Sequence, residues 1–257
     1  MKYFKYKPST LLAPYIEYYW TLELEDYCSS DLDTIRLPDH SPEWVFRIGH
    51  PKEESFITLN YKDNATVIVD SPIEIFAIRF RPYGMACIGN INMREFDGGA
   101  GVLPSDYVFP SLNSKFEDIA FSLYSDVSKI ALMEDVLKQQ LAEYAIIDKL
   151  LSAVVNDISG AKGNVSINKL CKKYNRSRAT LSQRFAEYTG LSPKELARIY
   201  RFNHFVITKL KQCDKTFAEV ALECGYYDQS HLNREFKSIT GITPSRFFSY
   251  ASSIVVK

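Results

Sequence analysis

The stretch from Phe217 to Phe247 reads FAEVALECGYYDQSHLNREFKSITGITPSRF, and the same plan occurs earlier as INKLCKKYNRSRATLSQRFAEYTGLSPKEL from Ile167 to Leu196. In both copies, apolar residues of the first part recur at intervals of three and four residues, which is the spacing of one helix face. A tight turn and a second helical pattern follow. The two stretches are therefore predicted to be two copies of one helix, turn and helix unit.

The turn and the second helix of each copy support this interpretation. Gly225 lies in the later turn and Asn175 in the earlier one, and both residue types tolerate a left-handed backbone. Each second helix carries a leucine and a phenylalanine four residues apart, which places both on one inner face. These pairs are Leu181 with Phe185 and Leu232 with Phe236. A helix-turn-helix of this kind inserts its second helix into the major groove of DNA.

Polar side chains on the outer face of the second helices are the candidate DNA contacts. Arg234 can bind guanine through two hydrogen bonds, and Asn233 or Gln183 can bind adenine in the same way. The alternative interpretation is an ordinary solvated helix surface, which one copy alone would favour and two copies in the same frame do not. The candidate set is Arg178, Ala179, Ser182, Gln183, Ser230, His231, Asn233, Arg234 and Lys237.

A further helix is predicted between the two units. Ser192 and Thr243 each precede a proline, and a hydroxyl at the N-cap followed by proline at the first helical position starts a helix. From Pro193 to Leu210 the apolar residues form one stripe, as in an amphipathic helix. This helix would set the distance between the two units, which should approach one turn of B-DNA, ~34 Å.

Residues 164 to 248 resemble the DNA-binding domain of the AraC/XylS family of bacterial transcriptional regulators. The resemblance covers about a third of the chain and is carried by Ala221, Gly225, Tyr226, Asp228-Gln229-Ser230, Arg234, Phe236-Lys237, Gly241, Thr243-Pro244 and Phe247. It implies an all-α domain with two helix-turn-helix units joined by a linker helix, in a transcriptional regulator that binds double-stranded operator DNA. RNA polymerase, a small-molecule effector and a second copy of the chain are further partners that it allows. Gln183 stands where family members often have arginine, so the operator sequence stays open.

The charge distribution divides the chain in the same place. The whole chain has 31 basic and 31 acidic residues, which alone argues against a simple nucleic-acid binder. From Lys162 to Tyr250, however, 16 Lys and Arg face 7 Asp and Glu, a net charge of +9, and from Met1 to Ala161 the counts are 14 and 24, a net charge of −10. A basic domain suits phosphate neutralisation and an acidic one does not, so two different domains are expected.

The composition is that of a globular, cytoplasmic protein associated with the nucleoid. No run of about 18 apolar residues is present, so no membrane partner is expected. The start, MKYFKYKPST, lacks the apolar core of a signal peptide. The five cysteines are odd in number and form no CxxC pair, which is typical of reduced thiols.

The first domain is predicted to be β-rich, with trailing helices. Short strand-like runs separated by turn residues suggest a small barrel or sandwich. The expected strands are Trp44–Ile48, Ser55–Leu59, Ala65–Val69 and Ile73–Phe80, and the expected helices lie near Phe116–Ser125, Ser128–Tyr144 and Ile146–Asp157. We therefore expect a multidomain chain, with a sensor or dimerisation domain at 1–155, a linker at 156–163 and the DNA-binding domain at 164–257.

Part of this first domain is similar to the sensor half of an uncharacterised AraC-family branch. The similar segments are Tyr15-Ile16-Glu17-Tyr18-Tyr19-Trp20, Arg36-Leu37-Pro38-Asp39-His40, Pro42-Glu43-Trp44-Val45-Phe46 and Arg79-Phe80-Arg81-Pro82. The similarity implies a cupin-like barrel that binds an effector or pairs subunits, and it brings no named ligand. The candidate ligand-binding residues are Arg36, His40, Trp44, Phe46 and Arg79.

A catalytic role for this domain is not expected. A metal-dependent cupin needs two or three histidines and a carboxylate, whereas the domain has only His40 and His50. Cys28 and Cys87 show no pairing with histidine that would activate a thiol. We therefore expect a binding domain without metal or cofactor. The competing hypothesis is an interaction protein with a degenerate DNA reader, which specific DNA binding with a steep salt dependence would exclude.

Overall fold

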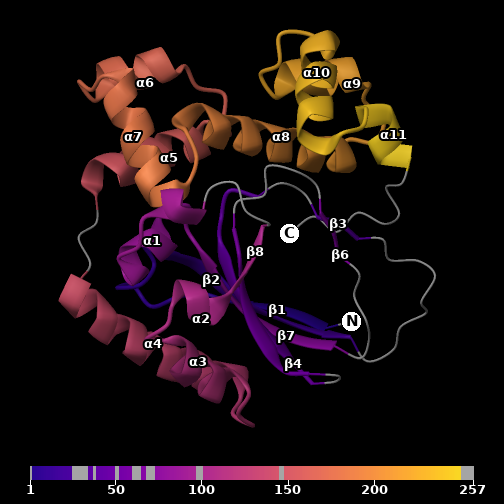
Figure 1. The fold of residues 1–257 in the computed structure, drawn as a ribbon. Coiled ribbons are helices and arrows are strands. Elements are labelled where there is room, and N and C mark those ends of the chain that lie inside the picture. Colours follow the sequence, from indigo (N-terminus) through magenta and orange to yellow (C-terminus); the bar gives the residue numbers. More distant parts are fainter. Residues whose placement is uncertain are drawn as a thin grey trace.

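The computed structural model describes residues 2–24, 34–36, 39–49, 52–59, 65–67, 73–96, 101–144 and 148–249. An antiparallel sheet with its helices forms the N-terminal region, and a row of helices forms the C-terminal region (Figure 1). The two regions lie against each other along helix α8, which crosses above the sheet in this view. The expected combination of a β-rich first domain and a helical second domain is confirmed.

A six-stranded antiparallel sheet is the framework of the first region. Its order is β1-β2-β7-β4-β5-β8, and β3 pairs with β6 in a separate two-stranded sheet. The strands are β1 Lys2–Tyr6, β2 Ile16–Leu24, β3 Thr34–Arg36, β4 Glu43–Ile48, β5 Glu54–Thr58, β6 Ala65–Val67, β7 Ile73–Phe80 and β8 Val102–Pro104. The four strands expected from the sequence are therefore confirmed, and β1, β2, β3 and β8 are additional.

The two faces of this sheet have different neighbours. Because side chains alternate along a strand, Trp44 and Phe46 of β4 share one face and Val45 lies on the other. Trp44 stacks between helical aromatic residues on its face, with its ring centroid 4.6 Å from that of Phe116. On the opposite face, Val45 belongs to a smaller buried cluster with Trp20 and other strand residues. The main core of the first region therefore lies between the sheet and its helices.

Short helices follow the sheet and lead into the second region. They are α1 Gly84–Gly89, the 3-10 helix η1 Met93–Phe96, α2 Ser105–Val108, α3 Asn113–Ala120, α4 Asp126–Tyr144 and α5 Lys149–Gly160. Helices α2, α3 and α4 lie on one side of the sheet, and β3 and β6 lie on the other (Figure 1). Thr21 of β2 and Tyr6 of β1 both donate hydrogen bonds to Asp126, which fixes the start of α4 on the sheet.

The second region has the two predicted helix-turn-helix units. Its helices are α6 Ile167–Lys173, α7 Arg178–Thr189, α8 Pro193–Lys211, α9 Phe217–Glu223, α10 Gln229–Thr240 and α11 Pro244–Ser249. The first unit is α6 and α7, the second unit is α9 and α10, and α8 joins them. Ser192 caps α8 through the backbone N–H of Glu195, and Pro193 is its first residue, as the sequence indicates.

The segment expected to be a free linker at 156–163 is instead packed structure. Residues 156–160 are the last part of α5, whose inner face buries Val155 and Ile158. At Gly163, which has a φ of +78°, an added Cβ would lie 2.1 Å from the carbonyl oxygen of Ala197. The turn after α5 thus runs directly against α8. The predicted linker therefore overlaps the end of α5, whose buried face the pattern NDISGAKGN does not reveal.

Candidate functional site

The two reading helices, α7 and α10, start from matched turns. Asn175 has a φ of 49° and Gly225 a φ of 82°, so both turns contain the left-handed residue that the sequence predicts. Ser177 caps α7 by accepting a hydrogen bond from Thr180. Asp228 caps α10 by accepting one from the backbone of His231, at 2.6 Å. These caps fix the N-terminal ends of both helices, from which base contacts are made in helix-turn-helix proteins.

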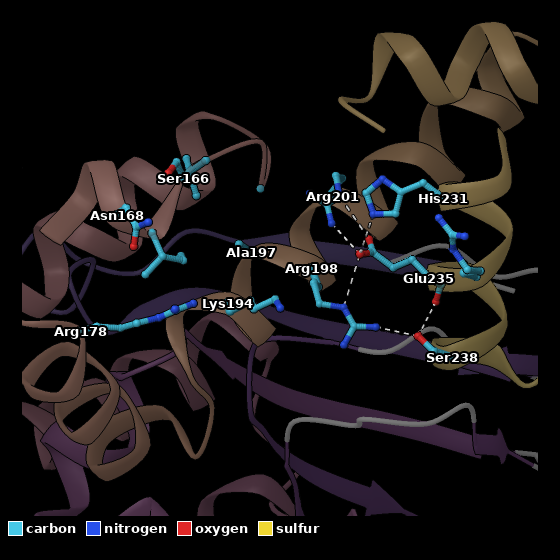
Figure 2. A pocket seen from close by; sticks show the side chains of 14 residues that line it. Ser166, Asn168, Arg178, Lys194, Ala197, Arg198, Arg201, His231, Glu235 and Ser238 are labelled. Atoms are coloured by element: carbon cyan, nitrogen blue, oxygen red, sulfur yellow. Dashed lines mark hydrogen bonds and ion pairs between the residues drawn. The ribbon is translucent and has the colours of Figure 1, made fainter. Parts of the chain in front are cut away.

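A basic groove of about 590 Å³ lies between the two reading helices, with α8 along its floor (Figure 2). Arg178 of α7 lines one side, and His231 and Arg234 of α10 line the other. Five cationic side chains and one carboxylate belong to its lining: Arg178, Lys194, Arg198, Arg201, Arg234 and Glu235. The groove therefore joins the two helix-turn-helix units through one positively charged surface, which suits a polyanion.

The remaining predicted DNA contacts lie outside this groove. Ala179, Ser230 and Lys237 are exposed, and Ser182 and Asn233 are half-buried. Gln183 is exposed, but its amide donates a 3.0 Å hydrogen bond to Glu187. The structure thus brings three of the nine candidates together at one groove. The other six are spread over α7 and α10.

Glu235 organises the arginines of the groove. Its carboxylate accepts two hydrogen bonds from Arg201, at 2.6 and 3.2 Å, and lies 3.4 Å from Nε of Arg198. Arg198 also donates a 2.6 Å hydrogen bond to Ser238. Burial disfavours the charge on Arg201, but its hydrogen bonds to Glu235 hold its pKa above the usual value. The guanidinium lies 4.9 Å from the ring centroid of Tyr226, so this cluster ties α8 to the second unit.

Sequence reasoning missed the contribution of α8 to the groove. Lys194, Arg198 and Arg201 are spaced four and three residues apart, so they form one stripe on the helix. The sequence prediction of this helix rests on its apolar stripe alone. A helical projection of the polar residues would have found the basic stripe as well, whereas the partner Glu235 lies on another helix and has no sequence signal.

Among the candidate ligand-binding residues, Trp44 and Phe46 do not share a face of the sheet with Arg79. Trp44 and Phe46 are fully buried in the core under the helices, on the sheet face opposite that of Arg79. Arg36 belongs to β3, and its side chain lies outside the described residues, as does all of His50. Trp44 and Phe46 are therefore packing residues, because strand alternation turns them away from the side on which Arg79 lies.

Arg79 is instead the centre of a buried ion cluster. Its guanidinium donates to Glu17 at 2.9 Å, to Glu43 at 3.0 Å and to both carboxylate oxygens of Asp39. Burial opposes ionisation here, but Arg79 lowers the pKa of Asp39 below its usual range, and the carboxylates raise the pKa of Arg79. The guanidinium is 7% exposed. These carboxylates engage four of the five N–H groups of Arg79, so the ion cluster fixes the position of its guanidinium.

This ion cluster lies beside α8. The ring of His40 contacts that of Tyr200 of α8, with centroids 3.9 Å apart and the two planes tilted by 35°. Burial lowers the pKa of His40, which favours its neutral form. The linker helix thus contacts the sheet region on one side and carries the basic groove on another.

Within the described residues, no group of three or more His, Cys, Asp or Glu could hold a metal ion.

The first helix-turn-helix unit is also bound to the sheet region. Arg184 of α7 forms an ion pair with Asp148, which caps α5. Lys173 and Tyr174 of the first unit both donate to Asp157 of α5, each through a bond of 2.8 Å or less. Helix α7 also packs against η1.

Among the described helices, none is long and apolar enough to span a bilayer.

Family comparisons divide the chain in agreement with this architecture. Residues 170–250 match a family described as a helix-turn-helix domain. Residues 4–100 match a family described as a domain of unknown function (DUF6597). The first match covers both reading helices and α8 from its start to its end. The second covers the end of β1, the strands β2 to β7, α1 and η1.

Two curated proteins are similar to part of the chain. An uncharacterised HTH-type transcriptional regulator of Haemophilus influenzae is 27% identical over 128 residues, which are 48% of this chain and 43% of that protein. The HTH-type transcriptional regulator MtrA of Neisseria gonorrhoeae is 30% identical over 82 residues, 32% of this chain and 27% of its own length. The chain therefore spans less than half the length of these relatives.

Solved structures of ToxT from Vibrio cholerae are similar over most of the chain at low identity. One is 14% identical and covers 90% of this chain and 95% of its own, with a TM-score of 0.40. A second is 15% identical and covers 97% and 98%, with a TM-score of 0.41.

Proposed function

This chain belongs to the AraC family of helix-turn-helix proteins, and we propose that it is a sequence-specific DNA-binding transcriptional regulator controlled through its N-terminal domain. The observation that carries the proposal is the shared basic groove. Arg178 of the first unit and Arg234 of the second lie on its two sides, and α8 holds both units at a fixed separation. Two reading helices beside one cationic groove suit a single duplex that runs past both.

The two units are expected to contribute differently to recognition. In the second unit, Arg234 is exposed and lies in the N-terminal half of α10, from which it can bind guanine in the major groove. In the first unit, Ala179 and Ser182 offer a methyl group and a short hydroxyl, which discriminate less between bases. We therefore propose that the second unit supplies most of the sequence preference. The first unit supplies position and part of the affinity.

Control would reach the DNA through the first unit and α8. Three contacts connect the N-terminal region to the reader: the ion pair between Arg184 and Asp148, the ring contact of His40 with Tyr200, and the packing of α7 on η1. An effector or a second copy of the chain that moved the sheet region would therefore shift the first unit relative to the second. Binding to the operator would change, and with it access of RNA polymerase in the cytoplasm.

The test is selection of bound fragments from a random DNA library with the purified full-length protein. We expect a motif of two half-sites whose centres are about 10 base pairs apart, because each reading helix enters the same face of the duplex. Selection with Arg234→Ala should retain one half-site and lose preference in the other. Absence of any enriched motif with wild-type protein would support the competing hypothesis of an interaction protein with a degenerate reader.

A further inference from the structure

The floor of the groove carries positive charge that the two reading helices do not explain. Lys194 and Arg198 of α8 lie between the units, and Figure 2 shows both directed into the space between α7 and α10. Lys194 is exposed, and among the described residues its ammonium group has no hydrogen-bond or ion-pair partner. A solvated lysine in a groove lined by other cations interacts favourably with an anionic group.

Arg198 is held in place but not saturated. Within the described residues, its Nε faces Glu235 at 3.4 Å and its Nη2 donates to Ser238 at 2.6 Å. A guanidinium has five N–H groups, so its Nη1 edge stays available for a further acceptor. The side chain is 34% exposed, so that edge can reach a ligand in the groove. Arg201, in contrast, is 16% exposed and pairs with Glu235 through two bonds.

We propose that Lys194 and Arg198 form a phosphate-binding site on the linker helix, which holds the DNA backbone between the two segments read by α7 and α10. The inference rests on the proposed function. When two reading helices enter successive turns of the major groove, the minor groove and its flanking phosphates face the protein midway between them. The ligand group is therefore a backbone phosphodiester, which arginine binds through paired N–H groups and lysine as a point charge.

Glu235 acts as a positioning residue for this site. A carboxylate in a groove that binds DNA would repel phosphate, but Glu235 is 6% exposed and is neutralised by Arg201. Its carboxylate also lies 3.9 Å from Nε2 of His231, and it orients Arg198, whose guanidinium is bound as well by Ser238 of α10. These two contacts hold Arg198 at the floor of the groove. In this position it would contact the phosphate backbone of the DNA and not the base edges.

The test is the salt dependence of binding for full-length variants on a selected operator and on random duplex. Lys194→Ala and Arg198→Ala are each expected to weaken binding roughly tenfold on both DNAs and to lower the slope of log affinity against log salt by about 1. Lys211→Ala is the matched control, since Lys211 is an exposed cation on the same helix outside the groove lining. It should leave the slope unchanged.

A double-mutant cycle tests the role of Glu235. If Glu235 orients Arg198, then Arg198→Ala lowers affinity less in the Glu235→Gln background than in the wild type, because the orientation is already lost. A purely structural role for Glu235 would leave the effect of Arg198→Ala unchanged between the two backgrounds. That result would overturn the positioning role.

Three outcomes separate this inference from the proposed function. If Lys194→Ala and Arg198→Ala both behave like Lys211→Ala while the wild type keeps its motif and salt slope, the phosphate site is wrong and the regulator stands. Loss of preference at single base pairs, instead of uniform weakening, would make these residues base contacts and also overturn the inference. If the wild type enriches no motif and shows no salt slope, both proposals fall.

Discussion

The two helix-turn-helix units have the same local plan but different surroundings. The first unit contributes Leu181 and Phe185 to an apolar cluster that also includes the sheet residues Trp44 and Phe76. The second unit has a cluster of its own, built around Phe236 from residues of α8 to α11. One unit is therefore an extension of the N-terminal region, and the other is a separate folding body attached through α8.

This difference shows how one repeated motif can serve two purposes. The docked unit forms ion pairs with α5 and packs on η1, so its position is tied to the N-terminal region. The second unit carries the predicted base contacts Asn233 and Arg234 and packs mainly on α8, with Asn164 beside its turn. If control passes from the N-terminal region to the DNA, the docked unit is the route that we propose.

The largest expected effect comes from truncating the central phenylalanine of each unit. Phe236 is fully buried against the rings of Phe202 and Phe247, at 5.0 and 5.2 Å, and Phe185 is equally buried. Phe236→Ala and Phe185→Ala should each lower the free energy of unfolding by about 3–5 kcal/mol. Hydrogen exchange should then accelerate only in α8 to α11 for Phe236→Ala, but in both the first unit and the sheet for Phe185→Ala.

Leu222→Ala is the control for that pair, because Leu222 is 61% exposed and should change stability little. Exchange changes confined to α6 and α7 in Phe185→Ala would show that the first unit is as independent as the second.

The turn of the second unit should be the more sensitive to a side chain. An alanine at Gly225 would have to keep a φ of +82°, and its Cβ would lie 2.5 Å from the side chain of Asn164, which can move aside. We expect Gly225→Ala to lower the unfolding free energy by about 1–3 kcal/mol, chiefly through backbone strain. In the first unit, Asn175→Gly should stay within about 1 kcal/mol of the wild type, since glycine adopts the same backbone freely.

Thermal or denaturant unfolding measures both changes. Gly160→Ala is the control, because Gly160 lies in α5 with no atom within 4 Å of an added Cβ and no positive φ. Equal stability of Gly225→Ala and Gly160→Ala would contradict the strained turn.

Base reading should also differ between the units. Arg234→Ala is expected to weaken operator binding by about 1–3 kcal/mol and to relax preference at one or two base pairs. Gln183→Ala should have a smaller effect, because Gln183 is already bonded to Glu187 and its backbone carbonyl lies 3.5 Å from Arg94. Competition binding across single-base variants of the selected operator measures both. A larger loss of preference for Gln183→Ala would reverse the roles of the two units.

The smallest expected effect concerns the ion pair between Arg184 and Asp148. Because Arg184 is 49% exposed, solvent screens the pair, and Arg184→Met should lower the unfolding free energy by only about 0.2–1 kcal/mol. Lys215→Met breaks a pair with Glu223 inside the second unit, in which the lysine is similarly exposed, at 43%. Hydrogen exchange should rise at α7 in Arg184→Met and at α9 in Lys215→Met.

Local patterns in the sequence were sufficient to predict the reader. Helix spacing, the left-handed turn residues and the Ser-Pro start of α8 are each decided within a few neighbouring residues, and all are present in the structure. The strands β4 to β7 were predicted for the same reason. The earlier strand β2 was missed although its sequence, IEYYWTLEL, has the aromatic and β-branched composition of a strand.

Interactions between distant segments could not be predicted in this way. Arg79 meets Glu17 and Glu43 because β7 lies between β2 and β4, an order that no spacing in the sequence gives. Similarly, alternation indicates that Trp44 and Phe46 share a face, but not that the helices cover it. The groove arginines and Glu235 come from different helices, so the site was predicted only as far as α7 and α10 themselves.

The close approach of Gly163 to α8 affects how this protein could be recombined with others. Its backbone lies against Ala197 with no room for a methyl group, so the connection from α5 to α6 does not tolerate insertions or bulkier residues. A chimera that exchanges the N-terminal region at residue 163 would place a foreign surface against α8. An exchange of regions should therefore be made before α5. Residues 148–163 should be kept together with the two helix-turn-helix units.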